Sequence, residues 1–472
     1  MQFCLVWIAR SRPDRGSDDP LGAFLDLLNL FNPQNVANEQ VTQHSHQGKA
    51  MPSDTLTNHK LIRWMTPLLI PRRLAYAKLL AGVLWTAWLV SLLAGPGYMD
   101  LAGQVVGTDF LQYYTAGYIV RAGDRARLYD LEYQAIVEAH IIGQELQDFF
   151  GFILPPFMAW LFWPFALLPY GLSFALWSIM GLFGLWMSLK FLLTPGTSPR
   201  RVFMWSLTWF PIFATIAFGQ NSLLSLFLFA LTYHLWRQER PFWAGMAASL
   251  LAYKPQLLLG LGLLWLLRWR KDWRALLGLG VGGSALVLLC FVTLPTASHA
   301  YIDFALTVLP ELPELAGRQI WHTQTFHEFW LLLLPGLPGV ANILRWILVG
   351  IGVVAFVRFC RCYREEKPLL YAGTMGLLIW ISPHANIYEM SLLLVPALLL
   401  WEYRPELRLA WRRVFVLIWL AFLFSGPLTY AQLEILRLPF AVQIGVPVWA
   451  AVLYLTYTWL VPSRQDKRQG AT

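Results

Sequence analysis

One apolar run, followed by a short polar motif, decides how the chain is placed. Residues 74–94 read LAYAKLLAGVLWTAWLVSLLA and carry a single charge, Lys78, near their start. As a helix rising about 1.5 Å per residue, this run is long enough to cross a hydrocarbon core about 30 Å thick. Gly107-Thr108-Asp109-Phe110 comes soon after it. We therefore expect Asp109 at a membrane–water boundary, where a carboxylate can stay ionised and still reach a lipid headgroup.

The composition indicates a polytopic membrane protein. Apolar residues make up 57% of the 472 residues, charged residues only 13%, and the mean hydropathy is +0.50, which excludes an ordinary soluble domain of this length. The net charge of +9 does not require a nucleic acid partner, because the Lys and Arg residues cluster at the ends of apolar segments. Attraction to anionic membrane lipids is expected instead.

Apolar segments between polar breaks predict an all-α integral membrane protein with about twelve transmembrane helices. The segments are 74–94, 154–169, 171–193, 202–218, 222–236, 242–267, 274–294, 339–358, 368–382, 386–402, 411–428 and 441–461. Together they form one membrane domain over residues 74–461. Residues 1–60 are predicted to be a polar, disordered cytoplasmic extension, and residues 462–472 a cytoplasmic tail. The four cysteines show no disulfide pattern and are expected to be reduced.

Basic residues orient the spans. If the spans alternate, the clusters 268–274, 358–367, 404–413 and 464–468 fall on one side, which the positive-inside rule assigns to the cytoplasm. Loops 95–153 and 295–328 then lie on the outer, periplasm-like side of the cytoplasmic membrane. This face carries Asp109, the loop histidines and the Ser382-Pro383-His384 turn.

One stretch does not fit simple alternation. There, Arg237 and Arg240 would lie outside and the Gly219-Gln220-Asn221 turn inside, against the positive-inside rule. Two short hairpins that enter from the cytoplasm, with tips at Gln220 and Lys254, would restore the charge distribution. Both arrangements remain open.

The first outer loop is predicted to contain two amphipathic interfacial helices. Thr108 is a suitable N-cap for a helix over 110–121 that stops at Gly123, and Asp130 is a suitable cap for a second helix reaching about Phe149. Apolar residues form a stripe on the second helix, opposite acidic residues that include Glu138. Both helices are expected to lie along the membrane surface.

A series of short motifs resembles glycosyltransferase family 87 from about Leu74 to about Pro396. In chain order the motifs are Gly107-Thr108-Asp109-Phe110, Tyr113-Tyr114-x-Ala116-Gly117, Gly123, Leu128-Tyr129-Asp130, Pro155-Pro156, Phe218-Gly219-Gln220-Asn221, Ala244-Gly245, Lys254-Pro255-Gln256, Ser382-Pro383-His384 and Tyr388-Glu389. The resemblance implies a C-type membrane glycosyltransferase that moves a sugar, mannose as the first candidate, from a polyprenyl phosphate to a lipid or glycan acceptor at the outer face. The family often has Asp where this chain has Glu389, so the role of Glu389 is open.

The residues themselves fit this chemistry. An acceptor hydroxyl that attacks an anomeric carbon must lose its proton, and Asp109 is the candidate general base. Taken alone, the position of Asp109 favours a carboxylate that only stabilises a helix start. A leaving lipid phosphate needs cationic donors, for which the candidates are Lys254, His384, Arg121, His322 and His327.

Each of these candidates has a plainer interpretation. Lys254 interrupts an apolar run, which marks it either as functional or as part of an internal ion pair. His384 could simply be a polar turn residue, and the loop histidines ordinary loop residues. Gln220 and Gln256 could bind sugar hydroxyls or could bridge helices within the membrane.

Neither a metal nor a cofactor is predicted. Asp109 has no acidic neighbour in sequence and no D-x-D motif occurs, while the glycine-rich stretch 278–283 lacks the lysine of a phosphate-binding loop. The competing class is a transporter or flippase of lipid-linked sugars, which would use the same polar residues without making a bond. Inverted repeats would favour a transporter, and none is evident in the sequence.

Overall fold

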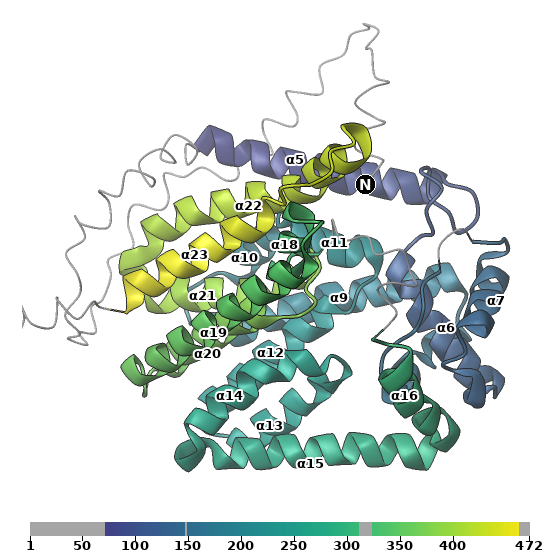
Figure 1. Ribbon diagram of the computed structural model, residues 1–472, viewed down its shortest axis with the longest axis horizontal. Helices are drawn as coiled ribbons and strands as arrows, with labels where there is room; N and C mark the ends of the chain where they lie inside the picture. Colours follow the sequence, from purple (N-terminus) through teal and green to yellow (C-terminus); the bar gives the residue numbers. More distant parts are fainter. Residues whose placement is uncertain (1–70, 147–148, 311–322, 462–472) are drawn as a thin grey trace, which may run out of the picture. The chain divides into compact units, whose positions relative to one another are not determined.

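The computed structural model describes residues 71–146, 149–310 and 323–461. Eighteen α-helices, joined by short loops and 3₁₀ turns, make up this part of the chain (Figure 1). The only strand-like pairings among the described residues are two isolated bridges. The predicted all-α class is confirmed. The extension 1–60, the tail 462–472 and His322 lie outside the described residues.

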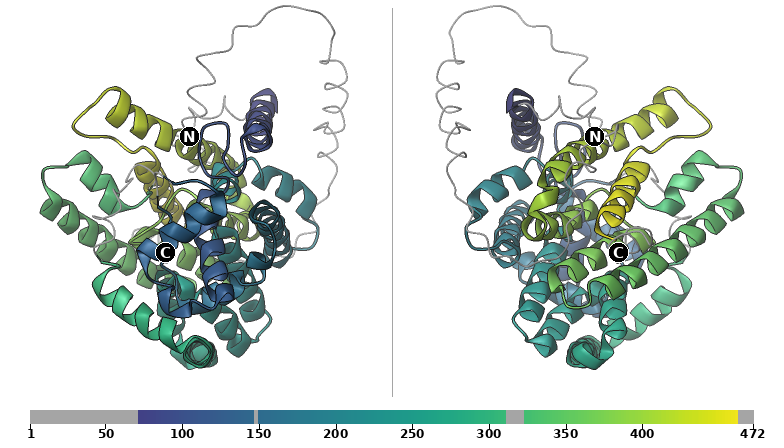
Figure 2. Two further views of the ribbon diagram at one scale, coloured as in Figure 1. Left: turned by 90° about the vertical axis from the view of Figure 1, so that its right-hand side faces the viewer. Right: turned by 90° about the vertical axis from the view of Figure 1, so that its left-hand side faces the viewer.

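Five of the described helices are long and apolar enough to cross a membrane. They are α5 (Pro71–Ala94), α9 (Tyr170–Leu192), α15 (Trp269–Thr293), α19 (Pro338–Cys362) and α22 (Arg408–Tyr430). A sixth span is possible if α10 (Pro199–Ser206) and α11 (Phe210–Phe218), which are bent by 71° at their junction, count as one. The predicted number of about twelve is not confirmed. Helices α5 and α15 run nearly parallel, since both lie across Figure 1 and both are seen almost end-on in Figure 2.

Proline explains why the predicted span 242–267 is broken. The segment 242–267 divides into α13 (Pro241–Ser249), two 3₁₀ turns and α14 (Leu259–Leu267). Pro255 disfavours the helical conformation in the residue before it, and Lys254 is accordingly non-helical at φ −129°, ψ 82°. The break therefore places a charged residue in the middle of an apolar run.

Other predicted spans form helices too short to pass as spans. Residues 154–169 give only α8 (Pro156–Phe162) and a 3₁₀ turn. The predicted spans 222–236, 368–382, 386–402 and 441–461 give α12 (Ser222–Arg237), α20 (Lys367–Ile381), α21 (Leu394–Tyr403) and α23 (Gly445–Leu460). Two further short helices, α16 (Pro295–Thr307) and α18 (Phe326–Leu333), lie outside the predicted spans.

The two helices predicted in the first outer loop are present, but the N-cap of the first and the end of the second differ from the prediction. Helix α6 (Thr108–Ala122) ends at left-handed Gly123, as expected, but its N-cap is Gly107. Asp130 caps α7 (Leu131–Ile142) by accepting a hydrogen bond from the Tyr133 amide at 3.0 Å. The second helix stops at Ile142, short of Phe149, because Gly143 adopts a left-handed conformation (φ 84°).

The buried face of α7 combines two residues of the predicted apolar stripe, Val137 and Ile142, with two polar residues. Gln134 and Glu138 are buried, whereas Ile136 is 64% exposed. The side-chain nitrogen of Gln134 donates to the Leu128 and Phe152 carbonyls, and its side-chain oxygen accepts from the Phe152 backbone amide. Gln134 therefore joins the loop that follows α7 to the turn that precedes this helix. Glu138, which the sequence placed opposite the apolar stripe, is thus buried with part of that stripe. The position of both helices at the membrane surface stays a prediction.

Three of the predicted basic clusters meet at one end of the helices. Lys271 pairs with Glu365 at 2.5 Å, Arg404 with Glu366 at 2.9 Å and Lys367 with Glu239 at 2.8 Å. These pairs join the turns that follow α12, α14, α19 and α21. The 16 residues of α12 span about 24 Å, so its first residue, Ser222, lies well away from this basic end.

Candidate functional site

Two glycines allow the start of α6 to pack against the turn between α11 and α12. Gly107 (φ 65°) and Gly219 (φ 69°) both adopt left-handed conformations. A Cβ at Gly219 would lie 2.5 Å from Phe110 Cβ, and a Cβ at Gly107 would lie 2.4 Å from Phe174 Cε2. No larger residue fits at either point. The close approach brings Gln220 against Asp109, the second residue of α6.

A hydrogen-bonded chain runs through Gln220. The Tyr113 hydroxyl donates to Gln220 Oε1 at 2.9 Å, and the Asn221 backbone amide donates to the same oxygen at 3.3 Å. The Gln220 side chain is also hydrogen-bonded to the Asp109 carboxylate. Tyr113 is one turn after Asp109 on α6, so both residues lie on the same face of this helix.

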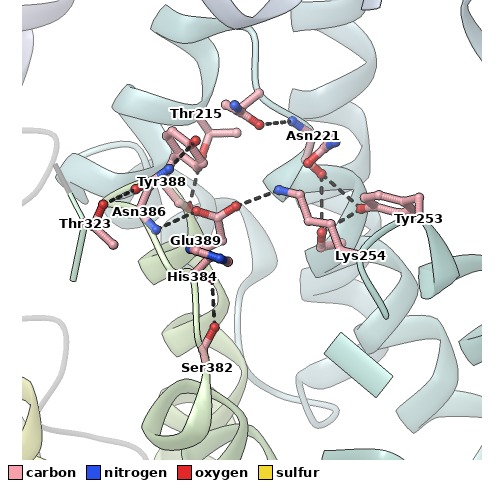
Figure 3. Close-up of polar contacts among 12 residues, drawn as sticks. Thr215, Asn221, Tyr253, Lys254, Thr323, Ser382, His384, Asn386, Tyr388 and Glu389 are labelled. Atoms are coloured by element: carbon pink, nitrogen blue, oxygen red, sulfur yellow. Dashed lines mark hydrogen bonds and ion pairs between the residues drawn. The ribbon is translucent and has the colours of Figure 1, made fainter. Parts of the chain in front are cut away.

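Lys254 and Glu389 form an ion pair beside this chain. Lys254 Nζ lies 2.6 Å from Glu389 Oε1, and the two side chains are only 14% and 13% exposed (Figure 3). The second carboxylate oxygen, Oε2, accepts a hydrogen bond from the Asn386 backbone amide at 2.8 Å. Lys254 is therefore paired, as one of the two sequence interpretations expected.

The segment that carries Glu389 is held by its neighbours. The Asn386 side-chain amide donates to the Tyr388 hydroxyl at 2.6 Å, and its oxygen accepts from the Thr323 hydroxyl at 2.9 Å (Figure 3). The backbone amide of Gln324 donates to the Ala385 carbonyl at 2.6 Å. These contacts fix the turn after α20 against the start of α18, and the Lys254 ammonium lies 5.9 Å from the centre of the Tyr388 ring.

Asp109 is half-buried and its electrostatic environment is mixed. Desolvation by the surrounding side chains raises the pKa of Asp109 to about 6, and the nearby Glu389 carboxylate acts in the same direction. The hydrogen bond from Gln220 and the charge of Lys254 oppose this rise. Burial raises the pKa of Tyr113 well above its usual value, so Tyr113 stays a neutral hydrogen-bond donor. The site thus combines a carboxylate that titrates near neutral pH with a fixed cation.

The structure brings together four of the predicted site residues: Asp109, Gln220, Lys254 and Glu389. Gln256 follows Lys254 by two residues and is half-buried. His384 is exposed, on the same turn as Asn386 and Glu389. His327 lies on α18, four residues after Thr323, and His322 is outside the described residues.

Arg121 is not brought to the other candidates. It lies twelve residues after Asp109 on α6, roughly 18 Å along the helix axis. Its guanidinium donates to the Ala166 carbonyl at 2.6 Å. This contact gives Arg121 a role in holding α6 to the turn after α8.

Sequence reasoning did not select Tyr113 or Asn386. Tyr113 had a usable signal, because its i+4 spacing from Asp109 predicts a shared helix face. Asn386 had no such signal, since its contacts reach Thr323 and Tyr388 through tertiary structure.

Among the described residues, no three His, Cys, Asp or Glu side chains cluster as metal ligands would.

The site also bears on the arrangement of residues 190–270. Simple alternation places Gln220 and Asp109 on opposite faces, yet they share a hydrogen bond. Glu239, next to Arg240, pairs with Lys367 at the basic end. Both contacts agree with hairpins whose tips are Gln220 and Lys254, and disagree with alternation.

Comparison with known proteins gives one match. The family model of glycosyltransferase family 87 matches residues 152–383, a stretch that contains Gln220 and Lys254 but not Asp109 or Glu389. Neither the curated proteins nor the solved structures gave a significant match to the chain. The match confirms the resemblance to glycosyltransferase family 87, and this family indicates a membrane glycosyltransferase.

Proposed function

We propose that the chain transfers a hexose from a polyprenyl-phosphate donor to a lipid or glycan acceptor at the outer face of the cytoplasmic membrane, with Asp109 as general base. One observation carries this proposal. A half-buried carboxylate with a pKa of about 6 shares a site with a cation held in place by Glu389.

Asp109 has the properties that a general base needs. With a pKa of about 6, it is mostly ionised at neutral pH and remains a stronger base than an exposed aspartate. In the proposed reaction, Asp109 takes the proton of the acceptor hydroxyl as the acceptor oxygen forms its bond to the anomeric carbon. The bond from that carbon to the phosphate oxygen breaks, and its electron pair leaves with the polyprenyl phosphate.

Lys254 suits the leaving group. An ammonium has three N–H donors, and Glu389 accepts from one of them at 2.6 Å. The other two can bind phosphate oxygens whose negative charge grows as the bond breaks. Since Glu389 fixes the cation before the donor binds, little reorganisation is needed during the reaction.

The position of the basic residues supports an outer site. Lys367, Lys271 and Arg404 mark one end of the helices, while Gln220 and Lys254 lie at the other end of α12 and α13. The positive-inside rule assigns the basic end to the cytoplasm. The opposite end, with Asp109, is then the outer side.

The donor class and the sugar are proposed from the family resemblance, with mannose as the first sugar to test. His384, Gln256, His327 and His322 are proposed as further contacts to the donor phosphate or sugar. Gln256 follows Lys254 by two residues, His384 precedes Glu389 by five, and His327 lies on α18, just after Thr323, which hydrogen-bonds Asn386.

Reconstituted protein tests the proposal. Release of polyprenyl phosphate from a lipid-linked mannose donor is measured with a panel of lipid and glycan acceptors. Asp109→Asn should lower release at least 100-fold, since a positioned base contributes roughly 10²–10⁴-fold. Asp303→Asn, at an exposed position on α16, is the matched control and should keep the parent rate.

Two results would contradict the proposal. Equal turnover of parent and Asp109→Asn would make Asp109 a helix-start residue only. Donor flipping without release, across the whole acceptor panel, would indicate a transporter. A parallel assay with a chelator is expected to keep its rate, because no metal is predicted.

A further inference from the structure

We propose that Tyr113 and Gln220 are positioning residues for Asp109: the Tyr113 hydroxyl fixes the amide of Gln220, and this amide holds the Asp109 carboxylate. The inference rests on the proposed function of Asp109 as a base. In this inference, the Gln220 side chain binds Asp109, the proposed base, and does not bind a sugar hydroxyl.

The orientation of the Gln220 amide follows from its neighbours. The Asn221 backbone N–H can only donate, so the amide atom facing it must be the oxygen, Oε1. The Tyr113 hydroxyl donates to that same oxygen. The amide nitrogen is then left to face Asp109, whose ionised carboxylate can only accept. A flipped amide would set donor against donor at one end and oxygen against oxygen at the other.

Both positioning residues are themselves immobilised. The Tyr113 ring is 2% exposed and stacks on Phe162 with ring centroids 4.9 Å apart. Gln220 is 7% exposed, and its backbone amide donates to the Thr215 carbonyl at 2.8 Å. Trp177 Nε1 donates to the Gly219 carbonyl at 3.0 Å, which secures the turn itself. The amide therefore cannot follow Asp109 if the carboxylate rotates.

This arrangement has two consequences for a base. The amide engages one part of the carboxylate, so the acceptor hydroxyl meets the remainder in a fixed direction. The hydrogen bond also favours the ionised form, together with Lys254 and against desolvation and Glu389. Three phenols, Tyr113, Tyr170 and Tyr388, also face Asp109, but phenols do not titrate near pH 6.

Gln220→Leu tests the inference through the pH dependence of kcat/KM. Loss of the amide should raise the pKa of Asp109, so the acid limb of the profile moves to higher pH by about one unit. At pH values well below the acid limb, a shift of this size lowers kcat/KM of the variant about tenfold relative to the parent. At higher pH, the activity of the variant should largely return. Tyr113→Phe keeps the ring but frees the amide, and should move the limb in the same direction by a smaller amount. Gln238→Leu, at an exposed position beyond α12, should not move it.

A purely structural role would give a different result. Activity would fall by the same factor at every pH, with the acid limb in place, and that would overturn the inference. If Gln220→Leu does not fold, Tyr113→Phe alone decides.

A second measurement does not depend on activity. Infrared difference spectra between low and high pH report protonation of carboxyl groups, and Asp109→Asn identifies the Asp109 signal. Its midpoint should rise in both Gln220→Leu and Tyr113→Phe, and an unchanged midpoint would contradict the inference. An inactive parent would count against the proposed function, whereas an unchanged midpoint would count only against the positioning role.

Discussion

Lys254 Nζ and Glu389 Oε1 lie 2.6 Å apart, although 135 positions separate the two residues in the chain. Each residue lies where an apolar run is interrupted, Lys254 before Pro255 and Glu389 at the start of a 3₁₀ turn. The pair is largely buried, so removing either partner leaves an uncompensated charge in a poorly solvated place. Variants of this pair must therefore distinguish the effect of an unpaired buried charge on stability from the loss of a group that acts in the reaction.

Lys254→Met is expected to lower kcat more than it weakens donor binding, because the leaving phosphate gains charge during the reaction. A charge-assisted hydrogen bond is worth about 1.5–3 kcal/mol, which corresponds to roughly a 10- to 100-fold loss in kcat. Lys254→Arg keeps the charge and should lose less. The measurement is kcat and KM for release of polyprenyl phosphate; a raised KM with unchanged kcat would contradict the assignment.

The double variant Lys254→Met, Glu389→Gln is the control for stability. It removes both charges, so its melting temperature should exceed that of Lys254→Met alone. Its activity should stay low. Recovery of activity in the double variant would mean that Lys254 serves only to neutralise Glu389.

Glu389→Gln is expected to move the acid limb of the pH profile to lower pH. The Glu389 carboxylate raises the pKa of Asp109, so removing its charge should bring this pKa below about 6, and the base stays ionised at lower pH. Lys254 acts in the opposite direction, so Lys254→Met should move the limb to higher pH. Profiles of kcat/KM against pH measure both shifts, and shifts in the same direction would refute this electrostatic account of Asp109.

The fold class could be predicted from the sequence, but the number of spans could not. Hydropathy identified every apolar run, and composition indicated the membrane. Whether a run crosses as one helix depends on breaks such as Lys254-Pro255 and the 71° bend between α10 and α11. In those runs the local preference of proline overrides the overall hydrophobicity.

The candidate site was partly predictable for a similar reason. Asp109, Gln220, Lys254 and Glu389 were selected singly, as polar residues in apolar surroundings or as matches to family motifs. Their contacts depend on tertiary packing around Gly107 and Gly219, which the sequence does not encode locally. Helix geometry, by contrast, separates Arg121 from Asp109 by three turns, and this could have been seen from spacing alone.

Cysteine labelling tests which face of the membrane carries the site. In a background with the exposed Cys362 replaced by Ser, a cysteine at His384 should react with a membrane-impermeant reagent added to intact cells. A cysteine at the exposed Arg270, in the basic end, should react only after the membrane is opened. The reverse pattern would place Asp109 in the cytoplasm and remove the basis for an outer acceptor.

Gly219→Ala is expected to damage the site by separating its two halves. Alanine at φ 69° is strained by roughly 1–3 kcal/mol, and its Cβ would lie 2.5 Å from Phe110 Cβ. Phe110 is fully buried, so the strain should displace the start of α6 and break the contact between Asp109 and Gln220. The matched control is Gly280→Ala on α15, where a Cβ meets open space and a small gain in stability, or no change, is expected. Melting temperature and turnover are measured for both variants. Gly219→Ala should lose stability and most of its activity, whereas parent-like values for both would show that the close approach of these segments is not required.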